Sequence, residues 1–193
     1  MFLYIIEIRR MLVNIFVLET NPITAARMHC DKHIPKMCVE AAQMMASALH
    51  RHDVPHDSMP LTKSGTMYKG GYKHHPCTVW AGETRDNFLW LGVHAVTLCN
   101  EYSQRFGREH ACNRPILLMM ELQDVIPEGG LTQFALAMPD EYRPEPIDGE
   151  IVYHAYPEHA VQAYRRYYHS KQFAKWEKGT PAPDWWRGVE VTA

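Results

Sequence analysis

The sequence lacks an excess of positive charge, because its 20 Lys and Arg residues are outnumbered by 22 Asp and Glu. A protein that binds nucleic acid through its overall charge usually has a pI above about 9. Any contact with DNA must therefore come from a local cluster of cations. Glycine and proline are far below the levels of a collagen-like chain, at 11 and 13 of 193 residues, and 46% of the residues are apolar. These proportions exclude collagen-like and disordered chains and suit one globular domain.

Cysteine pairs at metal-binding spacing are missing as well. The chain has five cysteines, an odd number, and no two of them form the C-x2-4-C pair of a structural zinc site. They also do not form the framework of a small secreted protein, so we expect a reducing, cytoplasmic compartment and no cofactor. Zinc or iron is the alternative, with candidate ligands among His29, Cys30, His33, His74, His75 and Cys77.

Long hydrophobic runs are absent after the first 18 residues. Residues 1–18 are apolar but contain three charged residues, and a membrane-spanning helix needs about 20 largely apolar residues. We therefore expect no membrane association. We interpret residues 1–10 as an apolar N-terminal extension, followed by a single domain over residues 11–193.

The pattern of apolar residues predicts a mainly α fold, a compact helical domain with a short N-terminal β element. Residues 12–18 are β-branched and aromatic, as in a buried strand. Asn21 followed by Pro22 is typical of a helix start, and Pro35 predicts a kink or a break near His33. The expected helices cover residues 22–50, 76–107, 115–122 and 157–178.

A basic loop is expected at about residues 58–78. No acidic residue occurs between residues 58 and 82, and the loop leads into a helix start at Pro76, whose free N–H groups favour a phosphate or another anion. In a plainer interpretation, His75 caps the helix and Cys77 fills the core. The expected substrate-binding residues of this loop are Lys63, Lys69, Lys73, His74 and His75.

Basic and aromatic residues alternate in the expected last helix, from Tyr164 to Lys178. Such interleaving suits single-stranded or distorted nucleic acid. An amphipathic helix that packs its rings on the body and exposes its cations gives the same pattern. In the aromatic C-terminal tail, Trp185 and Trp186 require something to pack on.

A cluster of chemically capable residues lies early in the chain. In an unbroken helix, His29, His33, Lys36 and Glu40 would share one face. A lysine beside a carboxylate can act as a nucleophile or as an acid–base pair. A solvated helix face with one ion pair has the same residues, so both interpretations stay open.

Two polar residues of the expected long helix, Glu83 and Asn87, lie on the same side as Trp80 and Trp90. Buried polar groups need partners. These two residues therefore either line a substrate pocket or sit at the edge of the core.

Several stretches of the sequence resemble an uncharacterised family of tailed-bacteriophage proteins. They are NIFVLETNP, MHCDKHIPKMCVEAAQMM, YKHHPCTVWAGETRDNFLWL, FALAMPDEYR, AYRRYY and PDWW. The order of these elements is similar to that of the pyrimidine-dimer DNA glycosylases of the phage endonuclease V type. Those enzymes are compact all-α proteins that excise damaged bases and nick the strand.

The resemblance implies roles for residues of the early cluster. Asp31, His33 and Glu40 correspond to the family's Asp-x-His element and catalytic Glu. The amine that attacks the sugar C1′ is the processed N-terminus in that family, and here it would come from Lys32, Lys36 or a processed start. The implied catalytic set is Asp31, His33, Lys36 and Glu40.

The favoured hypothesis is a phage enzyme of the infected host cell that acts on DNA or a nucleotide, by base excision of the glycosylase/lyase type or by base modification. The first alternative is a non-catalytic protein that binds a host or phage partner. The Met44-Met45 and Met119-Met120 pairs would give it adaptable contacts. The second alternative is a metal-dependent helical enzyme that uses the histidines named above.

Overall fold

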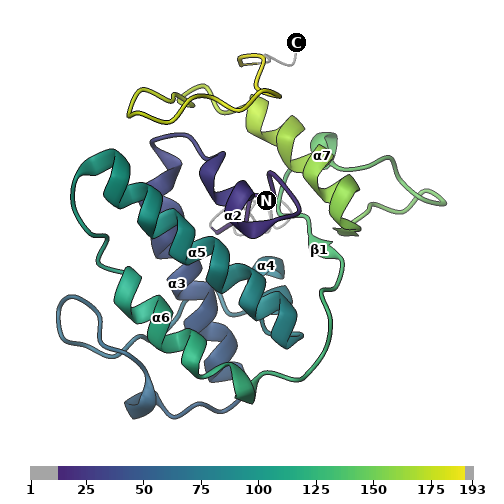
Figure 1. Cartoon of the computed structure of the whole chain (residues 1–193). Helices are drawn as coiled ribbons and strands as arrows, with labels where there is room; N and C mark the ends of the chain where they lie inside the picture. Colours follow the sequence, from purple (N-terminus) through teal and green to yellow (C-terminus); the bar gives the residue numbers. More distant parts are fainter. Residues whose placement is uncertain (1–12, 190–193) are drawn as a thin grey trace, which may run out of the picture.

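A computed structural model describes residues 13–189 and confirms a mainly α fold (Figure 1). The expected extension over residues 1–10 lies outside the described residues. A two-stranded antiparallel sheet pairs β1 (Phe134–Ala135) with β2 (His154–Ala155). The helices are α2 (Pro22–Arg27), α3 (His33–Arg51), α4 (Pro76–Ala81), α5 (Arg85–Phe106), α6 (Asn113–Glu121) and α7 (Pro157–His169). None of the helices within residues 13–189 is long and apolar enough to cross a membrane.

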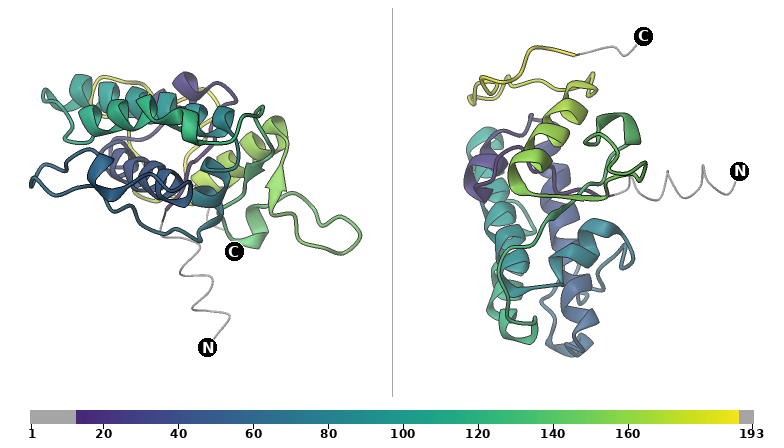
Figure 2. Two further views of the ribbon diagram at one scale, coloured as in Figure 1. Left: turned by 90° about the horizontal axis from the view of Figure 1, so that it is seen from below. Right: turned by 90° about the vertical axis from the view of Figure 1, so that its right-hand side faces the viewer.

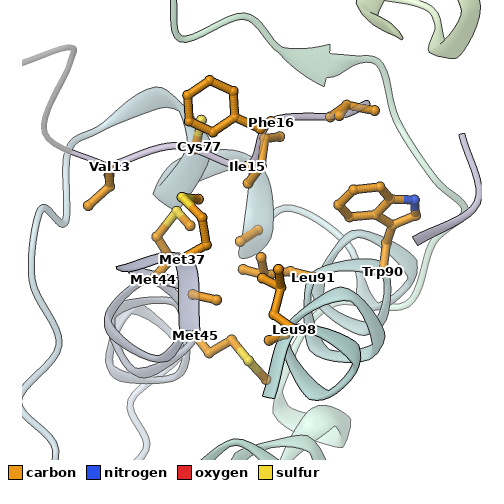
Figure 3. Close-up of a cluster of buried hydrophobic side chains, with 14 of the residues drawn as sticks. Val13, Ile15, Phe16, Met37, Met44, Met45, Cys77, Trp90, Leu91 and Leu98 are labelled. Carbon is orange, nitrogen blue, oxygen red and sulfur yellow. The ribbon is translucent and has the colours of Figure 1, made fainter. Parts of the chain in front are cut away.

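The core lies between α3 and α5, which run side by side (Figures 1 and 2). Met37, Met44 and Met45 of α3 face Leu91 and Leu98 of α5, and all five are buried (Figure 3). Complete burial of one such side chain stabilises the fold by about 1.5–3 kcal/mol. The interpretation of the Met44-Met45 pair as an exposed contact is therefore wrong, because this part of α3 faces the core.

The first helical segment is split into α2 and α3, one of the two arrangements expected at Pro35. Asn21 caps α2, and its side chain accepts the N–H groups of residues 23 and 24. Helix α2 ends at Arg27, and in the connection to α3 the Cys30 N–H donates to the Tyr168 hydroxyl at 2.9 Å. Pro35 then lies in the first turn of α3, where its missing N–H removes no helical hydrogen bond.

The expected continuous helix over residues 76–107 is wrong. Gly82 ends α4, and the Thr84 hydroxyl accepts the Asn87 N–H at 3.2 Å and so caps a new helix, α5. The predicted end is confirmed, since Gly107 has the left-handed φ of 69° of a C-cap. The sequence pattern missed the break because apolar residues continue on both sides of it.

The last helix ends at His169, nine residues before the expected Lys178. Beyond it the chain turns back, and the Trp176 indole donates to the Met28 carbonyl at 3.2 Å. The tail tryptophans find packing partners, as expected: the Trp186 ring stacks on His169 at 4.9 Å between centroids. Figure 1 shows this C-terminal segment in yellow above α7.

In place of the expected N-terminal strand, residues 13–17 form a buried segment that is not part of the two-stranded sheet. Asn14 holds it in place, because its side-chain amide donates to the Ala137 carbonyl at 2.6 Å. Phe16 adopts a φ of 36°, which is unusual for a residue with a Cβ. This turn directs the Phe16 ring toward α7, where it stacks on Tyr167 at 5.7 Å between centroids.

Candidate functional site

An exposed amine and a buried carboxylate meet near the start of α3. The Lys36 Nζ lies 3.1 Å from Oε1 of Glu40, and the side chains are 56% and 7% exposed. The other oxygen of Glu40 accepts the Asn14 main-chain N–H at 3.0 Å. Burial raises the pKa of the Glu40 carboxyl, and Lys36 and the Asn14 amide oppose that rise. The result is a sheltered carboxylate with one cation at its open side.

Lys171 has a second amine at this site. From the sequence it is expected only as one cation of a basic helix. This residue follows the end of α7, and its Nζ lies 3.4 Å from the centroid of the Tyr167 ring and 5.8 Å from that of Phe16. Burial, and then the charge of Lys36, lower the pKa of Lys171 to about 8. A lysine in this state supplies far more neutral amine near pH 7 than a solvated lysine does.

The His33 ring is surrounded by aromatic side chains. Its ring centroid is 4.8 Å from that of Phe16 and 5.1 Å from that of Tyr168. Burial, and then the charges of neighbouring His29 and lysines, hold the pKa of His33 well below its ordinary value. The ring is therefore neutral at pH 7 and serves as packing for the Phe16 ring.

Asp31 binds Arg105 rather than the lysines of α3. One of its oxygens lies 3.1 Å from Nη1 of Arg105, and the other accepts the Glu177 N–H at 2.6 Å. Arg105 is buried and also pairs with Glu101 at 2.9 Å. These bonds join the end of α5 to the C-terminal segment. The structure thus brings Lys36, Glu40 and His33 close together on α3, while Asp31 turns to Arg105.

The remaining lysine of the early cluster, Lys32, extends toward the C-terminal segment. Its Nζ lies 4.7 Å from the centroid of the Phe173 ring. Phe173 in turn packs edge-on against His33 at 5.1 Å between centroids. Phe173 is 38% exposed, so an aromatic face remains open to solvent beside this end of α3.

The basic loop encloses a surface pocket of about 900 Å³. Three of the five substrate-binding residues predicted in the loop line this pocket. Lys63 is exposed and is not among the lining residues, and His75 is buried as the N-cap of α4, accepting the Cys77 N–H at 3.2 Å. The pocket is lined by Ser47, His50, Arg51, His56, Lys69, Lys73 and His74.

Side chains of α3 hold the loop through hydrogen bonds to the loop backbone. The Ser47 hydroxyl donates to the Gly71 carbonyl and accepts the Gly71 N–H, both at 2.8 Å. Gly70 has a φ of 74°, and a Cβ at this position would lie 2.3 Å from the Ser47 Oγ. Arg51 also holds the loop, through its hydrogen bond to the Lys73 carbonyl. The loop can therefore approach α3 this closely only with glycine at position 70.

The amine–carboxylate pair and the basic pocket lie on one face of α3. Lys36, Glu40, Ser47 and Arg51 follow the i, i+4, i+11, i+15 spacing of a single helical stripe. At 1.5 Å per residue, the eleven residues from Glu40 to Arg51 correspond to roughly 16 Å along the helix axis. Glu40 and Ser47 are buried, so a ligand would reach this stripe at its exposed ends, Lys36 and Arg51.

The predicted residues Glu83 and Asn87 make their hydrogen bonds within the protein. The Asn87 side chain donates to the Trp80 carbonyl at 2.9 Å and accepts the Thr132 N–H at 2.9 Å. A carboxylate oxygen of Glu83 accepts from the Thr132 hydroxyl at 3.3 Å. Both residues thereby fix the segment that leads into β1.

The side chains best placed to hold a metal ion in the described part of the chain are Cys38, Cys99 and His110, whose ligand atoms all lie within 4.8 Å of one another. None of them is among the ligands considered from the sequence. Spacing could not reveal them, because 61 residues separate Cys38 from Cys99.

Comparison with known proteins adds independent information about the chain. The model of the pyrimidine dimer DNA glycosylase family matches residues 13–114, slightly more than half of the chain. The matched region contains the Lys36–Glu40 pair and the basic loop, and it ends before Lys171. No curated protein and no solved structure matches the chain. The length of the family match shows that the chain belongs to the pyrimidine dimer DNA glycosylase family.

Proposed function

We propose that the protein excises a damaged base from DNA and forms an imine between the sugar and Lys171, beside the Lys36–Glu40 pair. The observation that carries this proposal is a buried carboxylate paired with one lysine, near enough to a second lysine for the charge of the first to lower the pKa of the second. Lys36 is held by Glu40 at 3.1 Å and acts as a fixed cation. Lys171, whose pKa is lowered to about 8, has the reactive amine.

The N-terminal segment joins the two halves of this site. Asn14 donates its main-chain N–H to Glu40. Two residues later, the Phe16 ring lies 5.8 Å from the Nζ of Lys171. The same ring packs on His33, one turn before Lys36 on α3. Lys171 therefore approaches α3 across the Phe16 ring, at the end where Lys36 and Glu40 lie.

In the proposed reaction, the neutral amine of Lys171 attacks C1′ while the N-glycosidic bond breaks. The base leaves with the bonding electron pair and takes up a proton. The amine then loses its protons as the C1′–O4′ bond opens and O4′ is protonated, which leaves a C1′ imine. The Glu40 carboxylate stabilises the positive charge that develops on the sugar. Removal of a C2′ proton and cleavage of the C3′–O bond would then nick the strand.

The basic pocket suits the phosphates that flank the damaged nucleotide. Lys69, Lys73 and His74 are exposed and line it. Roughly 16 Å along α3 corresponds to about five base steps at ~3.4 Å each. With a net charge of −2, the protein has no general attraction for DNA, and this face would supply the contacts.

The test is borohydride trapping with ultraviolet-irradiated, abasic and undamaged DNA. We expect a covalent adduct with the first two substrates, and peptide mapping should place it on Lys171. Lys171→Arg, which keeps the charge but not the neutral amine, should abolish the adduct while leaving DNA binding in place. Lys175→Arg is the matched control. An adduct on Lys36 would overturn the assignment of the amine, and the absence of both adduct and base release would overturn the proposed function.

A further inference from the structure

A group of thiols and one imidazole lies away from the proposed catalytic site. Cys38 belongs to α3, Cys99 to α5 and His110 to the loop between α5 and α6. Both cysteines are fully buried and have free thiols, and His110 is half-buried. Their ligand atoms lie within 4.8 Å of one another. None of the residues proposed for catalysis or DNA binding belongs to this group.

We propose that Cys38, Cys99 and His110 bind a Zn²⁺ ion that has a structural role. Thiolate and imidazole are the ligands that zinc prefers, and tetrahedral sulfur–nitrogen sites of this kind are typical of structural zinc. Three groups from three separate elements meet here, so a bound ion would join α3, α5 and the α5–α6 loop. Such a connection adds stability to the folded state because the unfolded chain has no preformed site.

The geometry requires little rearrangement. With zinc–sulfur bonds of about 2.3 Å and zinc–nitrogen bonds of about 2.0 Å, neighbouring ligand atoms of a tetrahedral site lie roughly 3.5–3.8 Å apart. The limit of 4.8 Å among the three ligand atoms therefore leaves a contraction of about 1.3 Å at most. Changes of side-chain rotamer are sufficient for such a movement, and the helices can stay in place.

Cys112 lies outside the group within 4.8 Å, and it is the proposed fourth ligand because of its position next to His110. It follows His110 by two residues and lies just before α6, and only 6% of it is exposed. The Tyr68 hydroxyl donates to its Sγ at 3.4 Å. A donor of this kind stabilises a metal-bound thiolate and orients it. The complete set would be Cys38, Cys99, His110 and Cys112, with Tyr68 as a supporting hydrogen-bond donor.

The proposed zinc site is separate from the proposed chemistry. Cys38 lies between Lys36 and Glu40 in sequence, but two residues correspond to about 200° of rotation around a helix. The thiol is therefore on the opposite side of α3 from the amine–carboxylate pair. Loss of the metal should lower stability, and it should leave the imine chemistry of the folded protein unchanged.

The first experiment measures metal in the purified full-length protein, together with Co²⁺ titration of chelator-treated protein. We expect about one zinc per chain, a thiolate-to-cobalt charge-transfer band in the Co²⁺ form, and a higher Tm on addition of Zn²⁺ alone. A protein that contains no zinc and gives no thiolate band with Co²⁺ would overturn the proposal. A disulfide between Cys38 and Cys99 in freshly isolated protein would also overturn it.

Single substitutions test which residues bind the metal. Cys38→Ser and Cys99→Ser should each weaken the cobalt–thiolate band, because each removes one coordinated thiolate, and Tyr68→Phe should weaken metal affinity by about 10-fold. Cys30→Ser and Cys77→Ser are matched controls, because both cysteines are fully buried outside the cluster. A band of unchanged intensity in both folded cluster variants contradicts the assignment.

A second measurement does not depend on the folding of the variants. In the wild-type chain, Zn²⁺ should slow alkylation of Cys38 and Cys99, and peptide mass spectrometry would follow each thiol. Cys30 and Cys77 should react at the same rate with and without the metal. Equal protection of all four cysteines by Zn²⁺ would indicate general stabilisation and would overturn the assigned ligands.

Discussion

The main-chain N–H of Asn14 donates to Oε2 of Glu40 at 3.0 Å, while Lys36 occupies the other carboxylate oxygen. Glu40 is thus held between the N-terminal segment and its own helix. A carboxylate with two fixed neighbours keeps its position when the substrate arrives. This arrangement gives the proposed site a preorganised negative charge in a buried setting.

Replacing Glu40 by Gln should therefore reduce base excision by about 10²–10⁴-fold, the range typical of a positioned acid or base. The amide oxygen of Gln can still accept from Asn14, so we expect the fold and DNA affinity to be retained. Single-turnover excision and equilibrium binding would be measured on the same preparation. Glu83→Gln is the control, since Glu83 is an exposed carboxylate. Unchanged turnover in Glu40→Gln would exclude a role for this carboxylate in the chemistry.

Adduct formation should rise with pH through the titration of Lys171. Its pKa is lowered to about 8, so the reactive neutral amine is the minor form at pH 6 and the major form at pH 9. The rate should increase about tenfold per pH unit below pH 7 and level off above pH 8. Trapping rates from pH 6 to pH 9 with abasic DNA provide the measurement. A profile that still climbs steeply at pH 9 would point to an ordinary solvated lysine.

Contacts at the basic pocket should appear in the salt dependence of binding. Lys69→Ala and Lys73→Ala should each weaken binding to damaged and undamaged DNA alike, and each should reduce the slope of log K against log salt by about 1. Lys175→Ala removes the same charge from an exposed position on the C-terminal segment and should leave the slope unchanged. Equal salt-dependence slopes in all three variants would show that the phosphate contacts are made by other residues.

Two glycines of the basic loop permit a matched test of stability. Gly65 and Gly70 have φ values of 78° and 74°, but a Cβ at Gly65 meets nothing within 4 Å. Gly65→Ala should therefore show only the conformational cost of about 1 kcal/mol. Gly70→Ala adds a collision with Ser47 and should lower the free energy of unfolding by about 2–4 kcal/mol or detach the loop. Urea unfolding distinguishes the two variants, and equal losses would argue against close packing of the loop on α3.

Acid should destabilise the protein through its buried histidines. Burial lowers the pKa of His29 to about 4 and holds that of His94 well below its ordinary value. Between about pH 6.5 and pH 4 the unfolded chain binds more protons than the folded one, so stability falls as the pH falls through this window. His94→Phe should reduce this acid sensitivity, because it removes a ring whose two nitrogens have no hydrogen-bond partner in the described chain. Urea unfolding at pH 7 and pH 5 measures the free energy of unfolding of both proteins. An equal loss between the two pH values in wild type and variant would contradict the prediction.

The sequence predicts local features of this fold better than its tertiary contacts. The Asn21–Pro22 helix start and the Gly107 cap depend on neighbouring residues, and both are present in the structure. By contrast, the Cys30 N–H in the connection between α2 and α3 donates to a hydroxyl 138 residues away. For the same reason, the Lys36–Glu40 pair follows from helical spacing, whereas the burial of Lys171 requires the Phe16 turn. The Cys38–Cys99–His110 group likewise exists only after α3 and α5 have packed.

The contact between Phe16 and the segment after α7 has a consequence for protein synthesis. About 150 residues separate the Phe16 ring from the Lys171 amine that lies 5.8 Å from it. During translation, α3 and α5 leave the ribosome well before residue 171 and can pair. The reactive amine joins them only when almost the whole chain has been made. Incomplete chains would therefore carry the basic loop and the Lys36–Glu40 pair without the amine that we propose for the reaction.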